Sequence, residues 1–222
     1  MTQTVVVTGA AGALGKVVAG VLGRAGWQVI GVDKAEIAAE GLALALGGVS
    51  LTEPNEVARA VEAIRAKAPT IAGLVNIAGG FRWETIADGD VATWDLMYAL
   101  NVKTALVATR ALLPLLEGPA AIVNVGANAS TKADMGMGAY AASKAGVSRL
   151  TEALAQELKD KDVRVNAVLP SIIDTPANRA DMPDAEFDRW VTPEQLAGVI
   201  AFLLSDAASA VTGALLPVVG RV

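Results

Sequence analysis

The chain has 222 residues, of which 53% are hydrophobic and 18% are charged, a composition that excludes disorder and suits a single domain over residues 1–222. The formal net charge of −5 argues against nucleic acid or an anionic membrane surface as a partner. The sequence contains no cysteine and no histidine, which excludes disulfides, thiol nucleophiles, histidine-dependent triads and the usual zinc ligands, so we expect no metal site.

The first residues of the chain, Met1 to Thr4, include no basic group and lead directly into an apolar segment, so we expect no signal peptide. Charged residues or prolines interrupt the apolar runs before they reach the ~18 residues that span a membrane. We therefore expect a cytoplasmic protein that does not enter a membrane.

The first predicted element is a buried strand over residues 4–7, followed by a glycine-rich turn and a helix that continues to about Leu22. The turn has the spacing G-x-x-G-x-x-G and includes Gly9, Gly12, Ala13, Leu14 and Gly15. Glycine permits a tight turn and close approach of a pyrophosphate, and the start of the helix offers N–H groups to it. The stretch predicts a dinucleotide site; the alternative is an ordinary turn in a glycine-rich chain.

A second apolar strand over residues 29–33 ends in Asp33. An acidic residue about 20 positions beyond the glycine-rich turn is what a ribose 2′-hydroxyl requires, whereas a 2′-phosphate would be repelled by it. The pattern favours NAD(H) as cofactor. Lys34 beside the carboxylate keeps NADP(H) as an alternative.

The periodicity of the apolar residues predicts helices over residues 35–46, 54–67, 93–116, 140–159 and 192–204. It predicts further strands over residues 49–51, 71–76, 120–125, 163–169 and 215–219. Strands that alternate with helices imply right-handed crossovers. We expect an α/β protein with a Rossmann-type doubly wound parallel sheet of about seven strands and helices on both faces.

Candidate site residues follow the strands of this sheet, because ligands of such folds bind beyond the carboxyl ends of the strands. Asn76, Ala78 and Gly79 follow the strand over 71–76, and the small side chains allow a ring to approach the backbone. Asn101 lies within a predicted helix, where asparagine is only a moderate helix former. A plain turn and a core-bonded asparagine are the alternative interpretations.

Tyr140 and Lys144 are four residues apart in a predicted helix and therefore share one face. An ammonium at that range favours the tyrosinate, so we expect a pKa of Tyr140 below its usual value of about 10. Tyr140 could then give or take a proton near neutral pH, and Lys144 could also bind the nicotinamide ribose.

Together these residues resemble the short-chain dehydrogenase/reductase family over essentially the whole chain. The resemblance rests on Thr8-Gly9 to Gly15, Asp33, Asn76-x-Ala78-Gly79, Asn101, Tyr140-x-x-x-Lys144, and Asn166 to Pro170 with Thr175. It implies hydride transfer with a nicotinamide cofactor, Tyr140 as acid/base, Lys144 as the modulator of its pKa and Asn101 as organiser of a relay water. It also implies that Pro170 and Thr175 contact the cofactor, and that the helices at 93–117 and 140–160 form a homodimer or homotetramer.

Two positions depart from the family pattern. Ala13 stands where the family has its second glycine, and Ala127 stands where the family has a serine that holds the substrate carbonyl. Loss of such a donor can cost about 10²–10³ in rate. Either Asn128 or Ser130 substitutes for the serine, or the substrate needs little polarisation of its carbonyl.

Dihydropteridine reductase, a branch of the family, is similar in having alanine at this position, and residues 174–190 resemble its pattern. We therefore expect an NAD(H)-dependent oxidoreductase that reduces a pterin-like conjugated ring, with Trp83 and Asn178 as further candidates for substrate contact. One alternative is an alcohol dehydrogenase or ketoreductase acting on a small ketone or 3-oxoacyl substrate. Another is an NADH-sensing binding protein with little turnover.

Overall fold

Seven parallel strands form one sheet in the order β3-β2-β1-β4-β5-β6-β7, and the computed structural model describes residues 2–222. The strands are β1 (Thr4–Thr8), β2 (Gln28–Val32), β3 (Leu44–Leu46), β4 (Ile71–Asn76), β5 (Leu116–Val125), β6 (Val163–Pro170) and β7 (Leu215–Val218). In register, Thr8 at the end of β1 lies between Val32 of β2 and Asn76 of β4. The strand order reverses at this point, and the predicted doubly wound parallel sheet is confirmed.

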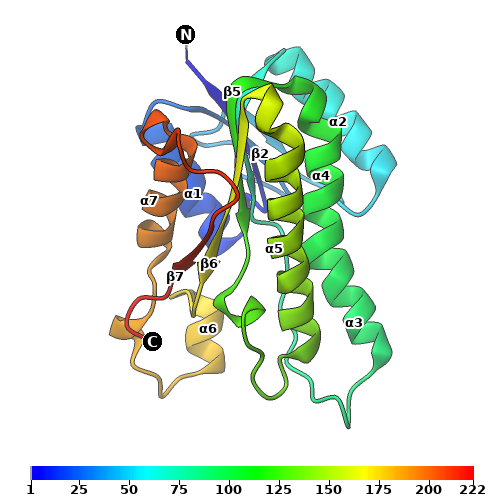
Figure 1. Ribbon diagram of the computed structural model, residues 1–222, viewed down its shortest axis with the longest axis vertical. Helices are drawn as coiled ribbons and strands as arrows, with labels where there is room; N and C mark the ends of the chain where they lie inside the picture. The colour runs from blue at the N-terminus through cyan, green and yellow to red at the C-terminus, as the bar shows by residue number, and fades with distance from the viewer. Residues whose placement is uncertain (1) are drawn as a thin grey trace.

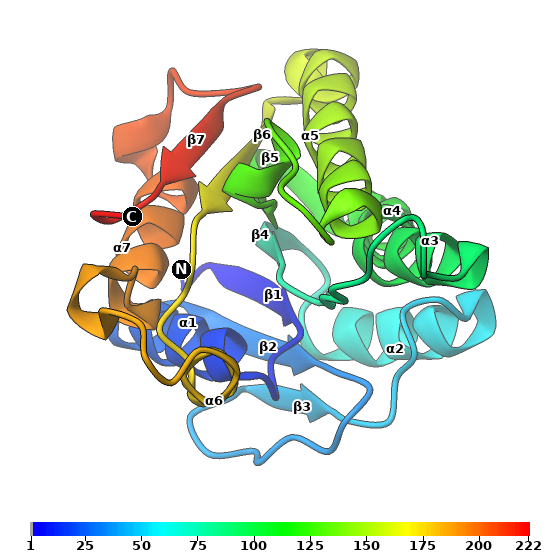
Figure 2. The same cartoon turned by 90° about the horizontal axis from the view of Figure 1, so that it is seen from below.

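Helices cover both faces of the sheet (Figures 1 and 2). Helices α1 (Ala13–Arg24) and α7 (Pro193–Leu204) cover one face, and α2 (Pro54–Lys67), α4 (Thr104–Leu112) and α5 (Gly138–Leu158) cover the other. Successive side chains of a strand point to opposite faces, so Val5 and Val7 pack under α1 and α7 while Val6 packs under the other layer. Burial on both faces explains the uninterrupted apolar run of β1.

The helix expected over residues 93–116 begins two residues earlier and is interrupted by a π turn. It consists of α3 (Val91–Tyr98), the π turn η1 (Ala99–Lys103), α4 and the 3₁₀ turn η2 (Leu113–Leu115). The side chain of Asp90 caps its start by accepting the N–H of Ala92 at 2.9 Å. By length and composition alone Val91–Leu115 could span a membrane. However, 44% of its most apolar 18-residue stretch is buried inside the protein. Its buried residues pack in the core between the sheet and the neighbouring helices.

The helix expected over residues 35–46 and the strand expected over 49–51 are both wrong. Residues 33–43 connect β2 to β3 without a helix, and the strand lies at Leu44–Leu46. Gly31 leaves space above the sheet: a Cβ there would lie 2.9 Å from the Leu42 side chain and 3.6 Å from that of Ile37. Two apolar side chains that fill one gap from an extended loop, together with Gly41 at φ +74°, override the helical composition.

The remaining elements match their predicted positions with two exceptions. Strand β5 starts at Leu116, four residues before the predicted position. A short helix, α6 (Pro176–Asp181), lies after β6 in a segment for which the sequence predicts no helix. This helix contains Asn178, one of the residues for which we expect substrate contact.

Candidate active site

The glycine-rich turn leaves β1 at the point where the strand order reverses. Gly9 has φ +70°, and a Cβ on it would lie 2.7 Å from the backbone nitrogen of Ala78. A Cβ on Gly15 would lie 2.0 Å from the carbonyl oxygen of Gly9. Neither position has room for a side chain, so the turn packs directly on the loop after β4.

Helix α1 starts within this turn, and no side chain caps it. Gly12 is its N-cap with extended backbone, and the helix begins at Ala13. Uncapped N–H groups at a helix start can bind an anion. Ala13 is exposed, so its methyl group adds bulk at the surface without disturbing the turn, whereas the Leu14 side chain is buried in the core. This arrangement fits the pyrophosphate of a dinucleotide.

The Asp33 carboxylate accepts two backbone hydrogen bonds, one from the glycine-rich turn and one from its own loop. Its Oδ2 accepts the N–H of Ala11 and its Oδ1 accepts the N–H of Ala35, both at 2.9 Å. The nearby Glu36 carboxylate lies over the backbone after β3, where a Cβ on Gly47 would be 2.8 Å from its Oε2. Two acidic side chains therefore lie at the adjoining ends of β2 and β3.

The loop after β4 is fastened to β1 by a residue that the sequence analysis does not single out as a site residue. The Thr8 hydroxyl accepts the N–H of Ile77 at 3.2 Å and that of Ala78 at 3.4 Å. A hydroxyl residue at the last position of a buried strand, directly before Gly9, is the signal that could identify it. The bond fixes Ala78 and Gly79 beside the glycine-rich turn.

Asn76 does not present its side chain to this edge of the sheet. Its Nδ2 donates to the Thr109 hydroxyl at 3.0 Å and to Asn124 Oδ1 at 2.9 Å, in the core beneath α4 and α5. Asn124 in turn donates to the Thr151 hydroxyl at 2.9 Å. The Asn76 side chain therefore lies in the core, with its buried Oδ1 unpaired, and contact between Asn76 and a cofactor stays a prediction for its backbone.

Asn101 lies in the π turn η1, and protein atoms use both hydrogens of its amide. Nδ2 donates to the Gly80 carbonyl at 3.0 Å and to the Ser143 hydroxyl at 2.9 Å, while Oδ1 accepts the N–H of Gly80 at 3.0 Å. The amide therefore has no hydrogen left to donate to a relay water. π turns recur at functional sites, and this one brings Asn101 to the carboxyl edge of the sheet.

Tyr140 and Lys144 share one face of α5, as predicted. Lys144 Nζ lies 5.9 Å from the centre of the Tyr140 ring and donates to the Val125 carbonyl at 2.9 Å. Burial raises the pKa of Tyr140 to about 12 and lowers that of Lys144 to about 8. The expected decrease in the pKa of Tyr140 is therefore wrong for the protein alone, because desolvation outweighs the ammonium.

The buried ammonium makes stability depend on pH. Because the pKa of Lys144 falls from 10.5 to about 8 on folding, the unfolded chain binds more protons between these values, and stability rises with pH across that window. We expect the free energy of unfolding to rise by about 3 kcal/mol from pH 8 to 10.5 relative to a Lys144→Met variant. Tyr140, with its pKa raised from 10.0 to about 12, opposes the rise only near and above pH 10, and both proteins share this contribution. Denaturant titrations of both proteins check this; a pH-independent difference would contradict it.

The structure does not bring a replacement hydroxyl from Ser130 to Tyr140. Ser130 Oγ lies 3.5 Å from Ser148 Oγ, and Ser148 is two helical turns, about 12 Å, beyond Tyr140 along α5. Ala127 is buried and Asn128 is exposed. Of the residues considered for this role, only Asn128 keeps an exposed polar side chain.

Aromatic side chains lie beside Tyr140. The Phe81 ring meets the Tyr140 ring edge-on, with centroids 4.9 Å apart and planes at 84°. Trp83 lies over Gly136, where a Cβ would be 2.2 Å from the indole, and the neighbouring Glu84 N–H donates to the Gly136 carbonyl at 2.8 Å. These contacts fasten the loop after β4 to the loop before α5.

The segment after β6 is held by its own side chains. Thr175 caps α6 by accepting the N–H of Asn178 at 3.3 Å, and Asn178 Nδ2 donates to the Ile173 carbonyl at 2.7 Å. Arg179 forms two hydrogen bonds with Asp174. Asn178 is thus engaged within the segment, which reduces its availability to a substrate, while Pro170 ends β6 beside the segment.

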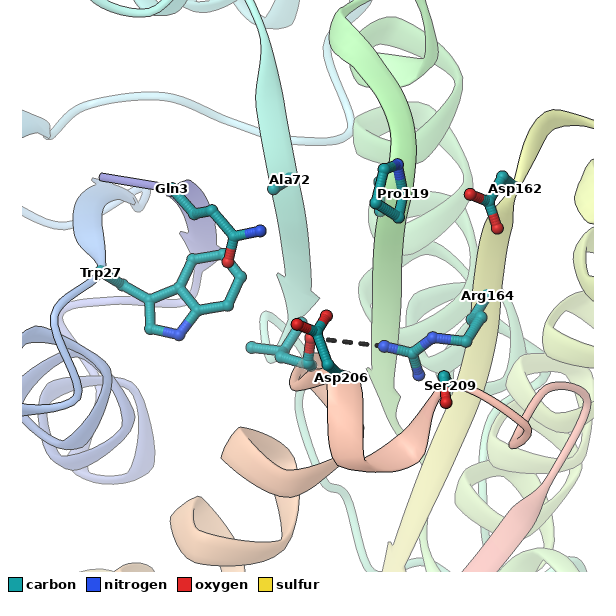
Figure 3. A pocket seen from close by; sticks show the side chains of 10 residues that line it. Gln3, Trp27, Ala72, Pro119, Asp162, Arg164, Asp206 and Ser209 are labelled. Carbon is teal, nitrogen blue, oxygen red and sulfur yellow. Dashed lines mark hydrogen bonds between the residues drawn. The ribbon is translucent and has the colours of Figure 1, made fainter. Parts of the chain in front are cut away.

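A hollow of about 70 Å³ lies at the opposite, amino end of the strands (Figure 3). There Arg164 donates to the carbonyls of Leu203, Leu204 and Ser205, which end α7. Burial lowers the pKa of Arg164, and Asp206 and Asp162 oppose that effect. The hollow is therefore a helix-capping site far from Tyr140.

Removing this cap should destabilise the protein. We expect Arg164→Ala to reduce the free energy of unfolding by about 1–3 kcal/mol, because three carbonyl groups lose a charged donor. Arg149→Ala, which removes an exposed pair with Glu152, is the matched control and should cost less than about 1 kcal/mol. Urea denaturation measures both, and equal losses would contradict the capping role.

Known proteins are similar to this chain in sequence and in fold. The profile of the short chain dehydrogenase family matches residues 3–186. The 2-(S)-hydroxypropyl-CoM dehydrogenase 3 of Xanthobacter autotrophicus is 30% identical over 98% of this chain and 95% of its own. A 3-oxoacyl-(acyl-carrier-protein) reductase of Thermotoga maritima is 30% identical over 96% of this chain and 95% of its own.

Solved structures give the same result. A 3-ketoacyl-(acyl-carrier-protein) reductase from Brucella melitensis, complexed with NADH, superposes with a TM-score of 0.88 at 28% identity, covering 99% of this chain and 98% of that one. A short-chain type dehydrogenase/reductase from Mycobacterium ulcerans superposes with a TM-score of 0.90 at 30% identity, covering 99% and 89%. The chain therefore belongs to the short-chain dehydrogenase/reductase family of nicotinamide-dependent oxidoreductases.

Proposed function

We propose that the protein is an NADH-dependent reductase of an electron-poor C=O or C=N group in a planar, conjugated ring of pterin-like character. The observation that carries this proposal is the lack of a hydroxyl at Ala127, with Ser130 directed toward Ser148 instead. A simple ketone needs a second donor to its developing oxyanion. A ring that is already electron-poor depends less on such a second hydrogen-bond donor.

The residues at the switch point fit a dinucleotide. Gly9 and Gly15 allow the tight turn that leaves Gly12 and Ala13 exposed at the start of α1, and Asp33 lies at the end of β2, where we expect a ribose. Ala78, Gly79, Pro170 and Thr175 would flank the nicotinamide end. When bound, the nicotinamide supplies or accepts the hydride. The two carboxylates of Asp33 and Glu36 favour NAD(H) over NADP(H).

Tyr140 would donate its phenolic proton to the substrate oxygen or nitrogen while hydride adds to the neighbouring carbon. A pKa of about 12 keeps Tyr140 protonated at neutral pH, which suits reduction. Lys144, with a pKa of about 8, is mostly protonated there and would stabilise the phenolate left behind. Solvent then returns the proton to Tyr140.

The aromatic side chains beside Tyr140 support a flat substrate. Phe81 and Trp83 are 53% and 54% exposed although they lie in the loops around the site. Exposed aromatic surface at such a place can stack on a planar ring. We therefore expect substrate contact from Trp83, and contact from Asn128 at the polar edge of the ring.

A substrate panel tests the proposal, with NADH oxidation followed by absorbance. Quinonoid dihydropterin should be reduced faster than a small aliphatic ketone or a 3-oxoacyl thioester at equal concentration. The reverse order would favour the second candidate, a ketoreductase or alcohol dehydrogenase, to which the names of the relatives point. NADH binding without turnover of any substrate would indicate a sensor.

We also propose a cytoplasmic homodimer or homotetramer assembled through α3, α4 and α5. Val91, Trp94, Tyr98 and Leu106 of the first two helices are 40% to 77% exposed, which is unusual for large apolar side chains on neighbouring turns. Light scattering of the purified protein tests the assembly, and a monomer at micromolar concentration would contradict it.

A further inference from the structure

Ser143 lies between Tyr140 and Lys144 and joins two separate parts of the candidate site. Its hydroxyl accepts a hydrogen from Asn101 Nδ2 at 2.9 Å and donates its own to the Tyr140 carbonyl at 2.7 Å. Ser143 is buried, with only 4% of its surface exposed. The hydroxyl therefore bridges the π turn η1 and the first turn of α5.

The Asn101 end of this bridge is also fixed to the loop after β4. Its amide forms a pair of hydrogen bonds with the backbone of Gly80, and a Cβ on Gly79 would lie 2.5 Å from its Oδ1. Only glycine at 79 lets the amide lie so close. Three segments, the β4 loop, the π turn and α5, thus meet at one amide and one hydroxyl.

The same three segments fix Tyr140 from two sides. Phe81 directly follows Gly80, and its ring contacts the ring of Tyr140. The backbone of Tyr140 is held through Ser143, and its side chain is held by Phe81. A shift of Asn101 relative to α5 would therefore move the ring contact and the backbone contact in concert.

We infer that Ser143 is a positioning residue for the proposed reduction, because its hydroxyl couples the Asn101–Gly80 pair to the turn that carries Tyr140. The ordinary alternative is a helix serine that only bonds a carbonyl of its own helix. Ser148 is the nearest such case: its hydroxyl bonds the Lys144 carbonyl at 3.3 Å and Ser130 Oγ at 3.5 Å, it makes no bond to Asn101, and the residue is 3% exposed. The two serines match in helix, burial and chemistry and differ in the bond to Asn101.

The experiment compares Ser143→Ala with Ser148→Ala. We expect Ser143→Ala to lower kcat by about 10- to 100-fold, since a misplaced proton donor is costly, with the Kd for NADH within about twofold of wild type. Ser148→Ala should change both within about twofold. NADH fluorescence titration measures Kd independently of turnover. Equal kcat values for the two variants would overturn the inference.

A double-mutant cycle separates coupling from general damage. In an Asn101→Ala background, Ser143→Ala should lower kcat by less than about twofold further, because the bond is already absent. Additive losses would overturn the inference. If Ser143→Ala shows no cooperative melt, Ser143→Cys replaces it in the comparison and in the cycle, since a thiol is a weaker donor and acceptor. The inference rests on the proposed function: a wild type without NADH affinity refutes that function, whereas an active wild type with unaffected variants refutes only the role of Ser143.

Discussion

Replacement of Tyr140 by phenylalanine is expected to lower kcat by about 10²–10⁴-fold and to leave the Kd for NADH within about twofold of wild type. The substitution removes one oxygen, which is the proton donor to the substrate. The edge-on contact with Phe81 and the bond from Lys144 to Val125 use other atoms and should persist. Steady-state kinetics and NADH fluorescence titration measure the two quantities separately.

Tyr98→Phe is the matched control, because Tyr98 and Tyr140 are the two tyrosines of the chain. Tyr98 ends α3 and is 55% exposed. Its variant should retain kcat and Kd within about twofold, since its hydroxyl lies outside the site and the substitution keeps the ring that belongs to the proposed assembly face. A Tyr140→Phe variant with wild-type turnover would contradict the proposed chemistry at its central step.

The direction of the Tyr140 pKa cannot be predicted from local spacing. A helix with Tyr140 and Lys144 one turn apart predicts that the ammonium stabilises the tyrosinate. In the folded chain Lys144 turns its Nζ to the Val125 carbonyl, and both side chains are largely desolvated. Burial depends on the packing of segments far apart in sequence, so the sign of the shift follows from the tertiary structure.

Local signals predict the parts of the site that depend on backbone shape. The glycines at 9 and 15 are needed because neighbouring backbone atoms leave no space for a Cβ, and such needs appear directly in a sequence. Asp33 is predictable from the end of an apolar strand, and the structure fixes it to Ala11 of the turn. Short uninterrupted apolar segments that alternate with helices likewise predict the parallel sheet, because its buried strands must be apolar on both faces.

The features that local sequence does not predict are side-chain orientations set by partners distant in sequence. The partners of the Asn76 side chain, Thr109 and Asn124, lie 33 and 48 residues away and hold it in the core. Ser143 gives no local signal because its role depends on Asn101, 42 residues before it. The π turn has no simple pattern of residues, so the orientation of Asn101 is also beyond prediction.

The second large effect concerns the choice between cofactors. We expect Asp33→Asn to shift the ratio of the Kd values for NADPH and NADH by about 10²-fold in favour of NADPH. Like unit charges a few ångströms apart near a protein surface repel each other by several kcal/mol, and asparagine removes this repulsion of a 2′-phosphate. The asparagine of this variant would still accept the N–H of Ala11 through its amide oxygen, so the glycine-rich turn should keep its shape.

Glu40→Gln is the control, because Glu40 is an exposed carboxylate in the same connection between β2 and β3. Its variant should leave the ratio within about threefold, since screening by water and salt weakens the effect of a distant exposed charge. Lys34, next to Asp33, should already attract a phosphate in the wild type. In Asp33→Asn, no carboxylate at position 33 would oppose that attraction. The shift should therefore shrink as salt concentration rises. A ratio that stays constant in Asp33→Asn would mean that the ribose of the cofactor lies elsewhere than at the end of β2.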